Sequence, residues 1–310
     1  MFRFAAAACR ALGWWGRTEA RARRERLGRS LRGGALYGAW VSPVDDENDP
    51  LSRLRPLVIS APFGNYVQPA GLTPTVGTFT ALRRRGRVQQ IVKTVRWYPW
   101  KGAWVNRIGL RNPGLAWYAG KVAAGRIDPS GQLVSIHGFD DAEWGKLVPE
   151  AAALKPLGME LNMSCPNVGH INWPAELFAD AVAAGAAHGV GVVVKLPPVN
   201  WEQMAAQAVD AGVRAFHCCN TLPVAKGGMS GKPLLPVALG VVRAMRERFG
   251  DSLRLIGGGG ITGPRDVAAY REAGADHYAL GTKVMNPRYL VSGAGLGRLK
   301  RAAESGMCDV

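Results

Sequence analysis

Residues 159–167 read MELNMSCPN, and the rest of the chain is interpreted from this stretch. Its first five residues are mostly apolar and predict a short buried strand. Pro166 cannot donate to a sheet ladder and restricts Cys165 to extended or turn geometry, so the strand is expected to end in a loop that carries the thiol. Two amides, Asn162 and Asn167, flank this thiol. Such an arrangement suits a polar, planar ligand better than a hydrophobic core.

Outward from this stretch, short β-branched apolar runs alternate with Ala-rich segments. This alternation predicts a parallel sheet covered by helices on both faces. Eight such units over roughly 250 residues favour an α/β fold of the (β/α)8 TIM-barrel type over an open sheet. The predicted strands are Leu57–Ala61, Gln90–Val95, Leu133–Ile136, Met159–Met163, Gly191–Leu196, Ala215–Cys219, Leu253–Ile256 and His277–Leu280. The predicted helices are Asp141–Leu154, Ala175–His188, Trp201–Ala211, Leu235–Phe249 and Pro264–Ala273.

The N-terminal region differs from the rest in charge. Residues 1–34 contain nine Arg and two Glu, a net charge of 9 − 2 = +7, whereas the 310-residue chain as a whole carries +16. Residues 42–54 are polar and bounded by Pro, which predicts a linker. We therefore expect two parts: a basic N-terminal extension with its linker over residues 1–54, and the barrel over residues 55–310.

Several interpretations of residues 1–34 stay open. Aromatic and aliphatic side chains among arginines are typical of an amphipathic helix at a membrane surface, which would give peripheral membrane association. An Arg-rich, acid-poor segment also fits a mitochondrial transit peptide. The simplest interpretation is a packing extension, or a misassigned start codon followed by a disordered tail. No run approaches the ~20 apolar residues of a membrane span, so a cytoplasmic localisation is the expectation.

The five cysteines follow neither a disulfide framework nor a zinc-binding spacing. Their odd number indicates a reducing compartment. Cys218 and Cys219 are adjacent on an apparent strand and are expected in the core. No metal site is predicted.

In a TIM barrel the chemistry lies just beyond the C-terminal ends of the strands. Six predicted strand ends carry polar residues or glycines there: Lys93-Thr94, Asn162, Lys195, Asn220-Thr221, Gly257–Gly260 and Gly281-Thr282. Any one of these is typical of a solvated Lys, a turn-forming Asn or a tight glycine loop, but six at one face indicate a site. Glycine loops after the last two predicted strands are typical of a phosphate cradle built from backbone N–H groups. Because Lys195 ends a buried strand, its charge needs a partner.

Six motifs resemble the dihydroorotate dehydrogenase family in order and spacing, and most closely its soluble class 1 members. They are ELNMSCPN, VVVKLPP, CCNT, GGMSGKPLLPVAL, GGGGI and ALGT. The segment IVKTV around Lys93 and the segment NRIGLRNPG at 106–114 match as well, and the likeness covers about residues 55–290. The resemblance implies an FMN-containing barrel that oxidises dihydroorotate to orotate in pyrimidine biosynthesis.

The resemblance also implies roles for individual residues. Cys165 would act as the general base that removes the C5 proton while hydride leaves C6 for the flavin. The substrate would be held by Lys93, Asn106, Asn162, Asn167, Asn220 and Thr221. FMN would contact Ala61, Lys93, Asn162, Lys195, Gly231, Gly259, Gly260, Gly281 and Thr282. The expected partner is the small-molecule substrate, in a homodimer that binds no nucleic acid.

The chain departs from the family pattern at several points. The first strand ends in SAPFGN, the loop after Lys93 reads WYPWKGAWVN, and Arg111 stands where a Pro is usual. These departures leave open a related flavoprotein that acts on another cyclic substrate. The net charge would also suit an RNA-modifying enzyme resembling the dihydrouridine synthases, although CCNT and GGMSGKP favour the first family. A non-enzymatic barrel that binds flavin or phosphate is a third alternative.

The electron acceptor cannot be inferred from the motifs. There is neither a strand–GxGxxG–helix unit nor an iron–sulfur cysteine cluster. Fumarate, a quinone, or NAD reached through a partner subunit all stay open.

Overall fold

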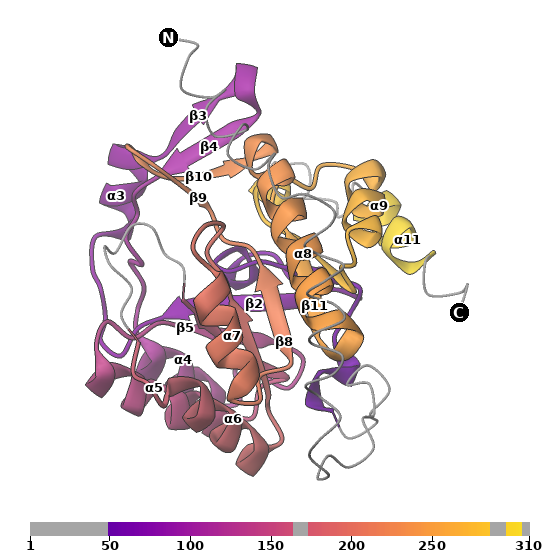
Figure 1. Cartoon of the computed structure of the whole chain (residues 1–310). Coiled ribbons are helices and arrows are strands. Elements are labelled where there is room, and N and C mark those ends of the chain that lie inside the picture. The colour runs from indigo at the N-terminus through magenta and orange to yellow at the C-terminus, as the bar shows by residue number, and fades with distance from the viewer. Residues whose placement is uncertain (1–48, 164–172, 286–295, 306–310) are drawn as a thin grey trace, which may run out of the picture. The chain divides into compact units, whose positions relative to one another are not determined.

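Eight parallel strands close into a barrel in the computed structural model, which describes residues 49–163, 173–285 and 296–305 (Figure 1). The strands, in order around the barrel, are β1 (Leu57–Ile59), β12 (His277–Leu280), β11 (Arg254–Gly258), β8 (Ala215–Cys218), β7 (Gly191–Lys195), β6 (Gly158–Asn162), β5 (Leu133–Ile136) and β2 (Thr73–Phe79). The prediction of a TIM barrel is confirmed. The proposed extension over residues 1–54 lies almost wholly outside the described residues, so its boundary stays a prediction.

The strands form where the sequence offers continuous apolar runs, because a parallel strand covered on both faces excludes water from every position. All residues of β5, β6 and β11 are buried. The parallel register pairs Asn162 of β6 with Lys195 of β7, and Lys195 with His217 of β8. Polar residues far apart in the chain are thereby brought level at the C-terminal ends of the strands.

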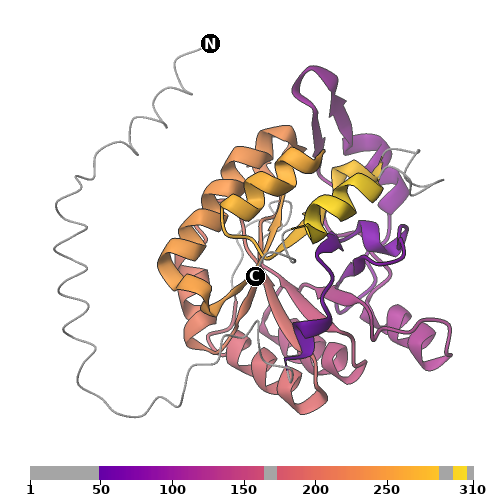
Figure 2. The ribbon, with the colours of Figure 1, turned by 90° about the vertical axis from the view of Figure 1, so that its right-hand side faces the viewer.

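Helices surround the barrel (Figure 2). They are α4 (Leu115–Ala123), α5 (Asp141–Ala153), α6 (Leu177–His188), α7 (Glu202–Asp210), α8 (Leu235–Phe249), α9 (Pro264–Glu272) and α11 (Gly297–Glu304). Short 3-10 helices are η1 (Pro50–Arg53), η2 (Phe63–Asn65), η3 (Pro99–Lys101), η4 (Lys232–Leu234), η5 (Gly250–Ser252) and η6 (Thr282–Met285). The five predicted helices are confirmed to within two residues at each end. Local signals explain this agreement: Asp140, for example, caps α5 by accepting the backbone N–H of Glu143 at 2.8 Å.

The prediction of a strand over Gln90–Val95 is wrong. Residues in this region form the helix α3 (Arg87–Thr94), whose Val88 and Val92 are 74% and 72% exposed. The apolar residues of this segment recur every three or four positions, which is the helical period. The second barrel strand is β2, which the sequence obscured because TPTVGTF contains Pro and Gly, two residues depleted in strand interiors.

A second, antiparallel sheet was not predicted. Its order is β3 (Arg96–Tyr98), β4 (Ala103–Asn106), β10 (Gly227–Gly231) and β9 (Leu222–Val224), and Figure 1 shows it at one end of the barrel, with α3 nearby. Its register places Asn106 opposite Gly228, so the segment after α3 is joined to the segment after β8.

No helix in the described ranges is both long enough and apolar enough to cross a membrane.

Candidate active site

A cavity of about 350 Å³ lies where the barrel strands end and the second sheet begins. A volume of this order is typical of small-molecule sites. Most of the predicted site residues line it, namely Ala61, Asn106, Asn162, Lys195, Asn220, Thr221, Gly231, Gly259, Gly260, Gly281 and Thr282. These residues come from eight separate strands or the loops that follow them, six in the barrel and two in the second sheet, and the tertiary fold brings them together.

Three predicted site residues are not among those that line the cavity. Lys93 was expected at the end of the second strand, and this position is wrong, because Lys93 is an exposed residue of the helix α3. Cys165 and Asn167 lie outside the described residues. Their roles therefore stay predictions.

A chain of hydrogen bonds crosses four strands or strand ends beside the cavity. The side-chain amide of Asn220 donates to Oδ1 of Asn162 at 3.1 Å, and Nδ2 of Asn162 donates to Oγ1 of Thr78 at 2.8 Å. Thr78 Oγ1 and Ser135 Oγ share a hydrogen bond of 2.9 Å. His137 Nδ1 donates to the backbone oxygen of Asn162 at 2.8 Å. These contacts fix which atoms of the two amides a bound ring would meet.

Lys195 ends β7 with a buried charge, and its partner is Glu160. Lys195 Nζ lies 3.9 Å from Glu160 Oε1, and His217 Nδ1 donates to Glu160 Oε2 at 2.7 Å. Burial opposes ionisation of Glu160, but the charge on Lys195 and the hydrogen bond from His217 outweigh it and lower the pKa of Glu160 to about 2. Burial and the Lys195 charge lower the pKa of His217. Lys195 and Glu160 therefore form an ion pair beside a neutral imidazole.

Two glycine segments, Gly231 and Gly259-Gly260, line another wall of the cavity and form a cradle. Gly260 has φ +77°, and a Cβ there would lie 2.8 Å from Cβ of Leu235 and 3.0 Å from the oxygen of Gly231. Gly231 has φ +99°, and a Cβ there would lie 2.2 Å from the oxygen of Gly102. Only glycine fits such positions, and it leaves backbone N–H groups open to a ligand. The cradle, with the hydroxyl of Thr282 and the cation of Lys195, fits a phosphorylated, electron-accepting ring such as FMN.

The cysteines on β8 and just after it match the expected core role. Both side chains are buried, and burial raises the pKa of Cys219 to about 12. Cys219 lines the cavity, but its thiol stays protonated at neutral pH, so it cannot serve as a base. Within the described ranges, no cluster of His, Cys, Asp or Glu could hold a metal ion.

Several lining residues escaped the sequence interpretation. The cavity also contains Tyr66, Thr78, Arg87, Arg111, Asn112 and Ser230. Asn112 is buried and accepts from the backbone N–H of Thr80 at 3.2 Å and of Gly114 at 2.8 Å, which anchors the loop that follows β4. The motif NRIGLRNPG contained Asn112 and could have pointed to it. Thr78 lay in the unrecognised strand β2.

Comparison with known proteins identifies the family. Residues 71–292 match the sequence profile of the family described as Dihydroorotate dehydrogenase. The catalytic subunit of dihydroorotate dehydrogenase B (NAD(+)) from Methanopyrus kandleri is 34% identical over 201 residues, which are 56% of this chain and 63% of that protein. The corresponding subunit from Alkaliphilus oremlandii is 31% identical over 244 residues, 68% of this chain and 80% of that protein. Dihydroorotate dehydrogenase A (fumarate) from Limosilactobacillus reuteri is 29% identical over 228 residues, 62% of this chain and 73% of that protein.

The match covers different shares of these relatives: it spans slightly less than two thirds of the Methanopyrus kandleri protein but more of the other two. Among solved structures, a ligand-free DHODH from Eimeria tenella superposes with a TM-score of 0.66 at 18% identity, covering 82% of this chain and 85% of that one. A complex of the Eimeria tenella DHODH with ferulenol gives 0.65 at 16% identity, covering 93% and 91%. At this identity the structures support the barrel fold alone. Because the family profile covers residues 71–292, which include all but the first of the eight barrel strands and most of the cavity, this chain belongs to the dihydroorotate dehydrogenase family.

Proposed function

We propose that this protein is an FMN-dependent oxidoreductase that converts dihydroorotate to orotate, the reaction of pyrimidine biosynthesis. The observation that carries the proposal is one cavity, in a chain of this family, that combines a glycine cradle, the buried cation of Lys195 and four side-chain amides. The cradle suits the phosphate of the cofactor, and the amides suit the ring of the substrate. Metal-dependent or phosphate-transfer chemistry would call for ligands of another kind.

Residues that line the cavity would hold the cofactor. Gly259, Gly260, Gly281 and Thr282 would bind its phosphate through backbone N–H groups and a hydroxyl. Lys195 would contact the ring, and Ala61 and Gly231 also line the cavity. When bound, FMN would supply the acceptor for the hydride that leaves C6 of the substrate. A cation such as Lys195 near the ring favours the negatively charged reduced form, which promotes that transfer.

The chain itself binds and orients the substrate and moves one proton. Asn106, Asn162, Asn220 and Thr221 present amides and a hydroxyl to the ring. Cys165 and Asn167 follow β6 in the sequence, and the thiolate of Cys165 takes the C5 proton as general base. Loss of that proton and of hydride from C6 leaves the C5–C6 double bond of orotate. This balances the reaction with no further group from the protein.

The proposal is tested by anaerobic titration of the purified, FMN-loaded protein with dihydroorotate. Loss of the oxidised flavin absorbance and formation of orotate in equal amounts are the expected result. A protein that holds FMN but is not bleached by dihydroorotate would instead be a flavoprotein with another substrate, or a binding protein. Fumarate, a quinone and NAD with a partner subunit are then compared as oxidants of the reduced protein.

The expected homodimer and the peripheral membrane contact of residues 1–34 are tested separately. Light scattering of the full chain gives its mass in solution. Sedimentation with anionic lipid vesicles, compared between the full chain and a chain that starts at residue 42, tests the membrane contact.

A further inference from the structure

Two arginines that line the cavity were not among the predicted site residues. Arg87, at the start of α3, and Arg111, in the loop after β4, both line the cavity. Lys195 is the third cation among the described lining residues, and those residues include no Asp or Glu. The charge of Lys195 is balanced from beneath by Glu160, whereas nothing acidic in the described lining balances the two arginines.

Neutral oxygens hold the two guanidinium groups in place. Arg87 Nε donates to the backbone oxygen of Arg111 at 2.9 Å, and Arg87 Nη1 donates to the hydroxyl of Tyr66. Arg111 Nη1 donates to the backbone oxygen of Arg85 at 3.2 Å. Arg111 Nε is buried and has no hydrogen-bond partner in the part of the chain that the structure describes. Two fixed cations with donor capacity to spare favour an anion beside them.

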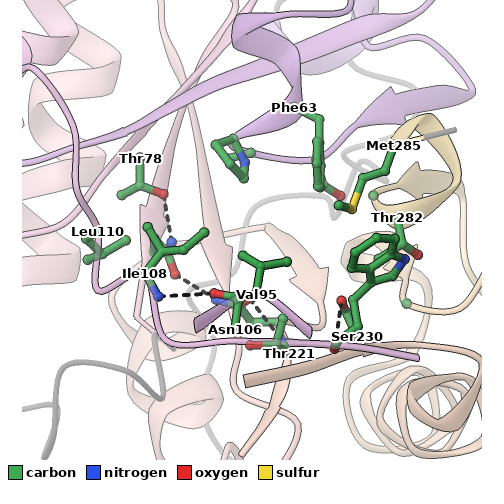
Figure 3. Close-up of a pocket in the computed structure, with 18 of the residues that line it drawn as sticks. Phe63, Thr78, Val95, Asn106, Ile108, Leu110, Thr221, Ser230, Thr282 and Met285 are labelled. Atoms are coloured by element: carbon green, nitrogen blue, oxygen red, sulfur yellow. Dashed lines mark hydrogen bonds between the residues drawn. The ribbon is translucent and has the colours of Figure 1, made fainter. Parts of the chain in front are cut away.

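The two arginines lie together beside Leu110, because Arg111 follows it in the chain and Arg87 is hydrogen-bonded to the backbone oxygen of Arg111. Figure 3 shows Thr78, Ile108 and Leu110 on one side, and Phe63, Thr282 and Met285 on the other. Arg111 directly follows Leu110, which has φ +52°, a left-handed conformation uncommon for a residue with a Cβ. Asn112 stabilises this turn by donating from Nδ2 to the oxygen of Leu110 at 2.7 Å. The loop is therefore fixed where the substrate, and not the cofactor phosphate, is placed by the proposed function.

We propose that Arg87 and Arg111 form the subsite that binds the carboxylate of the substrate. The ligand class is a planar ring that carries one carboxylate, and the arginines select for that charge. This inference rests on the proposed function for the identity of the ring. Guanidinium groups suit the task because their planar donors match the two oxygens of a carboxylate.

The test measures binding to the oxidised, FMN-loaded protein by calorimetry, with two ligands that differ in charge. Orotate carries the carboxylate, and orotamide replaces it with a neutral amide of similar shape. The wild-type protein should bind orotate more tightly than orotamide. Arg87→Gln and Arg111→Gln should each weaken orotate binding about 10- to 100-fold, the size expected for a lost hydrogen bond to a charged group, and leave orotamide binding and FMN content nearly unchanged. Arg111→Lys should recover part of the lost affinity, because it restores charge but not the planar fork.

Matched controls come from the same segment. Arg83→Gln removes an exposed arginine that is not among the cavity-lining residues, and Lys93→Gln removes the exposed lysine that the sequence had placed among the substrate-binding residues. Both should bind orotate as the wild type does. The inference is overturned if Lys93→Gln loses affinity while the two arginine variants keep it, or if the wild type binds orotate and orotamide equally well.

Failure of the proposed function would look different. A wild-type protein that retains FMN, ignores orotate and dihydroorotate, and binds another planar ring acid would refute the assigned reaction. The arginine subsite would then be tested with that acid and its amide. Weaker binding of the acid, but not of the amide, in both arginine variants would support the subsite. Unchanged binding of the acid would overturn it. Binding of no ring acid at all overturns both.

Discussion

Lys195 Nζ lies 3.9 Å from Glu160 Oε1, with the two side chains 4% and 0% exposed. Lys195 lines the cavity, whereas Glu160 lies behind it in β6 and also accepts the hydrogen bond from His217. The charge presented to a ligand is thus supported by a carboxylate that the ligand does not touch. Removing one partner of such a pair leaves an uncompensated charge in the interior, which is more costly than losing the pair as a whole.

Glu160→Gln keeps the shape of the side chain and removes its charge. We expect the variant to be less stable than the wild type by about 3–5 kcal/mol near neutral pH. The pKa of Glu160 is lowered to about 2 from an ordinary value of 4.5, so its contribution is complete above pH 4.5 and is lost as pH falls toward 2. The difference in the free energy of unfolding between the variant and the wild type should therefore become smaller below about pH 4.5. Urea unfolding at a series of pH values measures it.

Glu150→Gln is the matched control for this experiment. Glu150 forms an exposed i,i+4 pair with Lys146, and their side chains are 46% and 55% exposed. Exposed pairs of this kind contribute little, so this variant should stay within about 0.5 kcal/mol of the wild type at every pH. Equal losses in Glu150→Gln and Glu160→Gln would contradict a special role for the buried pair.

Thr78→Val removes the hydroxyl that joins Asn162 to Ser135 without changing side-chain volume much. The amide of Asn162 and the hydroxyl of Ser135 each lose a partner, so we expect a loss of about 1–3 kcal/mol in stability and weaker orotate binding. Thr75→Val, in the same strand, is the control. Thr75 Oγ1 is buried without a hydrogen-bond partner in the described part of the chain, so its removal should be neutral or stabilising. Denaturant unfolding of both variants distinguishes these outcomes, and a stable Thr78→Val protein would be the contrary result.

Cys165→Ala tests the general base. The variant should retain FMN but reduce it with dihydroorotate about 10²- to 10⁴-fold more slowly, as expected for loss of a positioned base. Cys219→Ala is the comparison variant. It removes a thiol that also lines the cavity but whose pKa is raised to about 12. It should react near the wild-type rate. Stopped-flow reduction under anaerobic conditions measures both, and an unchanged rate in Cys165→Ala would refute its assignment.

Gly260→Ala tests the phosphate cradle. Its φ of +77° and the 2.8 Å approach to Leu235 leave no room for a methyl group, so the loop must shift and FMN content should fall sharply. Gly240→Ala in α8 is the control, because no atom lies within 4 Å of the added Cβ and alanine favours a helix. It should keep full FMN content and gain up to about 1 kcal/mol in stability. FMN released by heat, relative to protein, measures the content; a fully loaded Gly260→Ala protein would argue against the cradle.

The parts of the site that could be predicted were those tied to local chemistry. A Lys at the end of an apolar run and glycines after two strands each carry their signal within a few residues. Lys93 was misassigned because KTV after an apolar pair resembles a strand end as much as a helix turn. Arg87 and Arg111 could not be found, since an arginine at the start of a helix or in a loop has no pattern that separates a solvated side chain from one at a cavity wall.

By itself, the sequence determined the alternation of apolar strands with helices and the polar or glycine residues at most strand ends, because both depend on nearest neighbours along the chain. The tertiary structure decided that β2 is the strand the sequence had placed at Gln90–Val95. Thr78 therefore lies near the end of that strand, whereas Lys93 lies in the helix α3. The tertiary structure also decided which cations meet in the cavity. Closing a barrel brings together residues separated by dozens of positions, and the second sheet carries the loop with Arg111 back to the barrel. Such long-range proximity is set by strand register and packing, which no short stretch of sequence encodes.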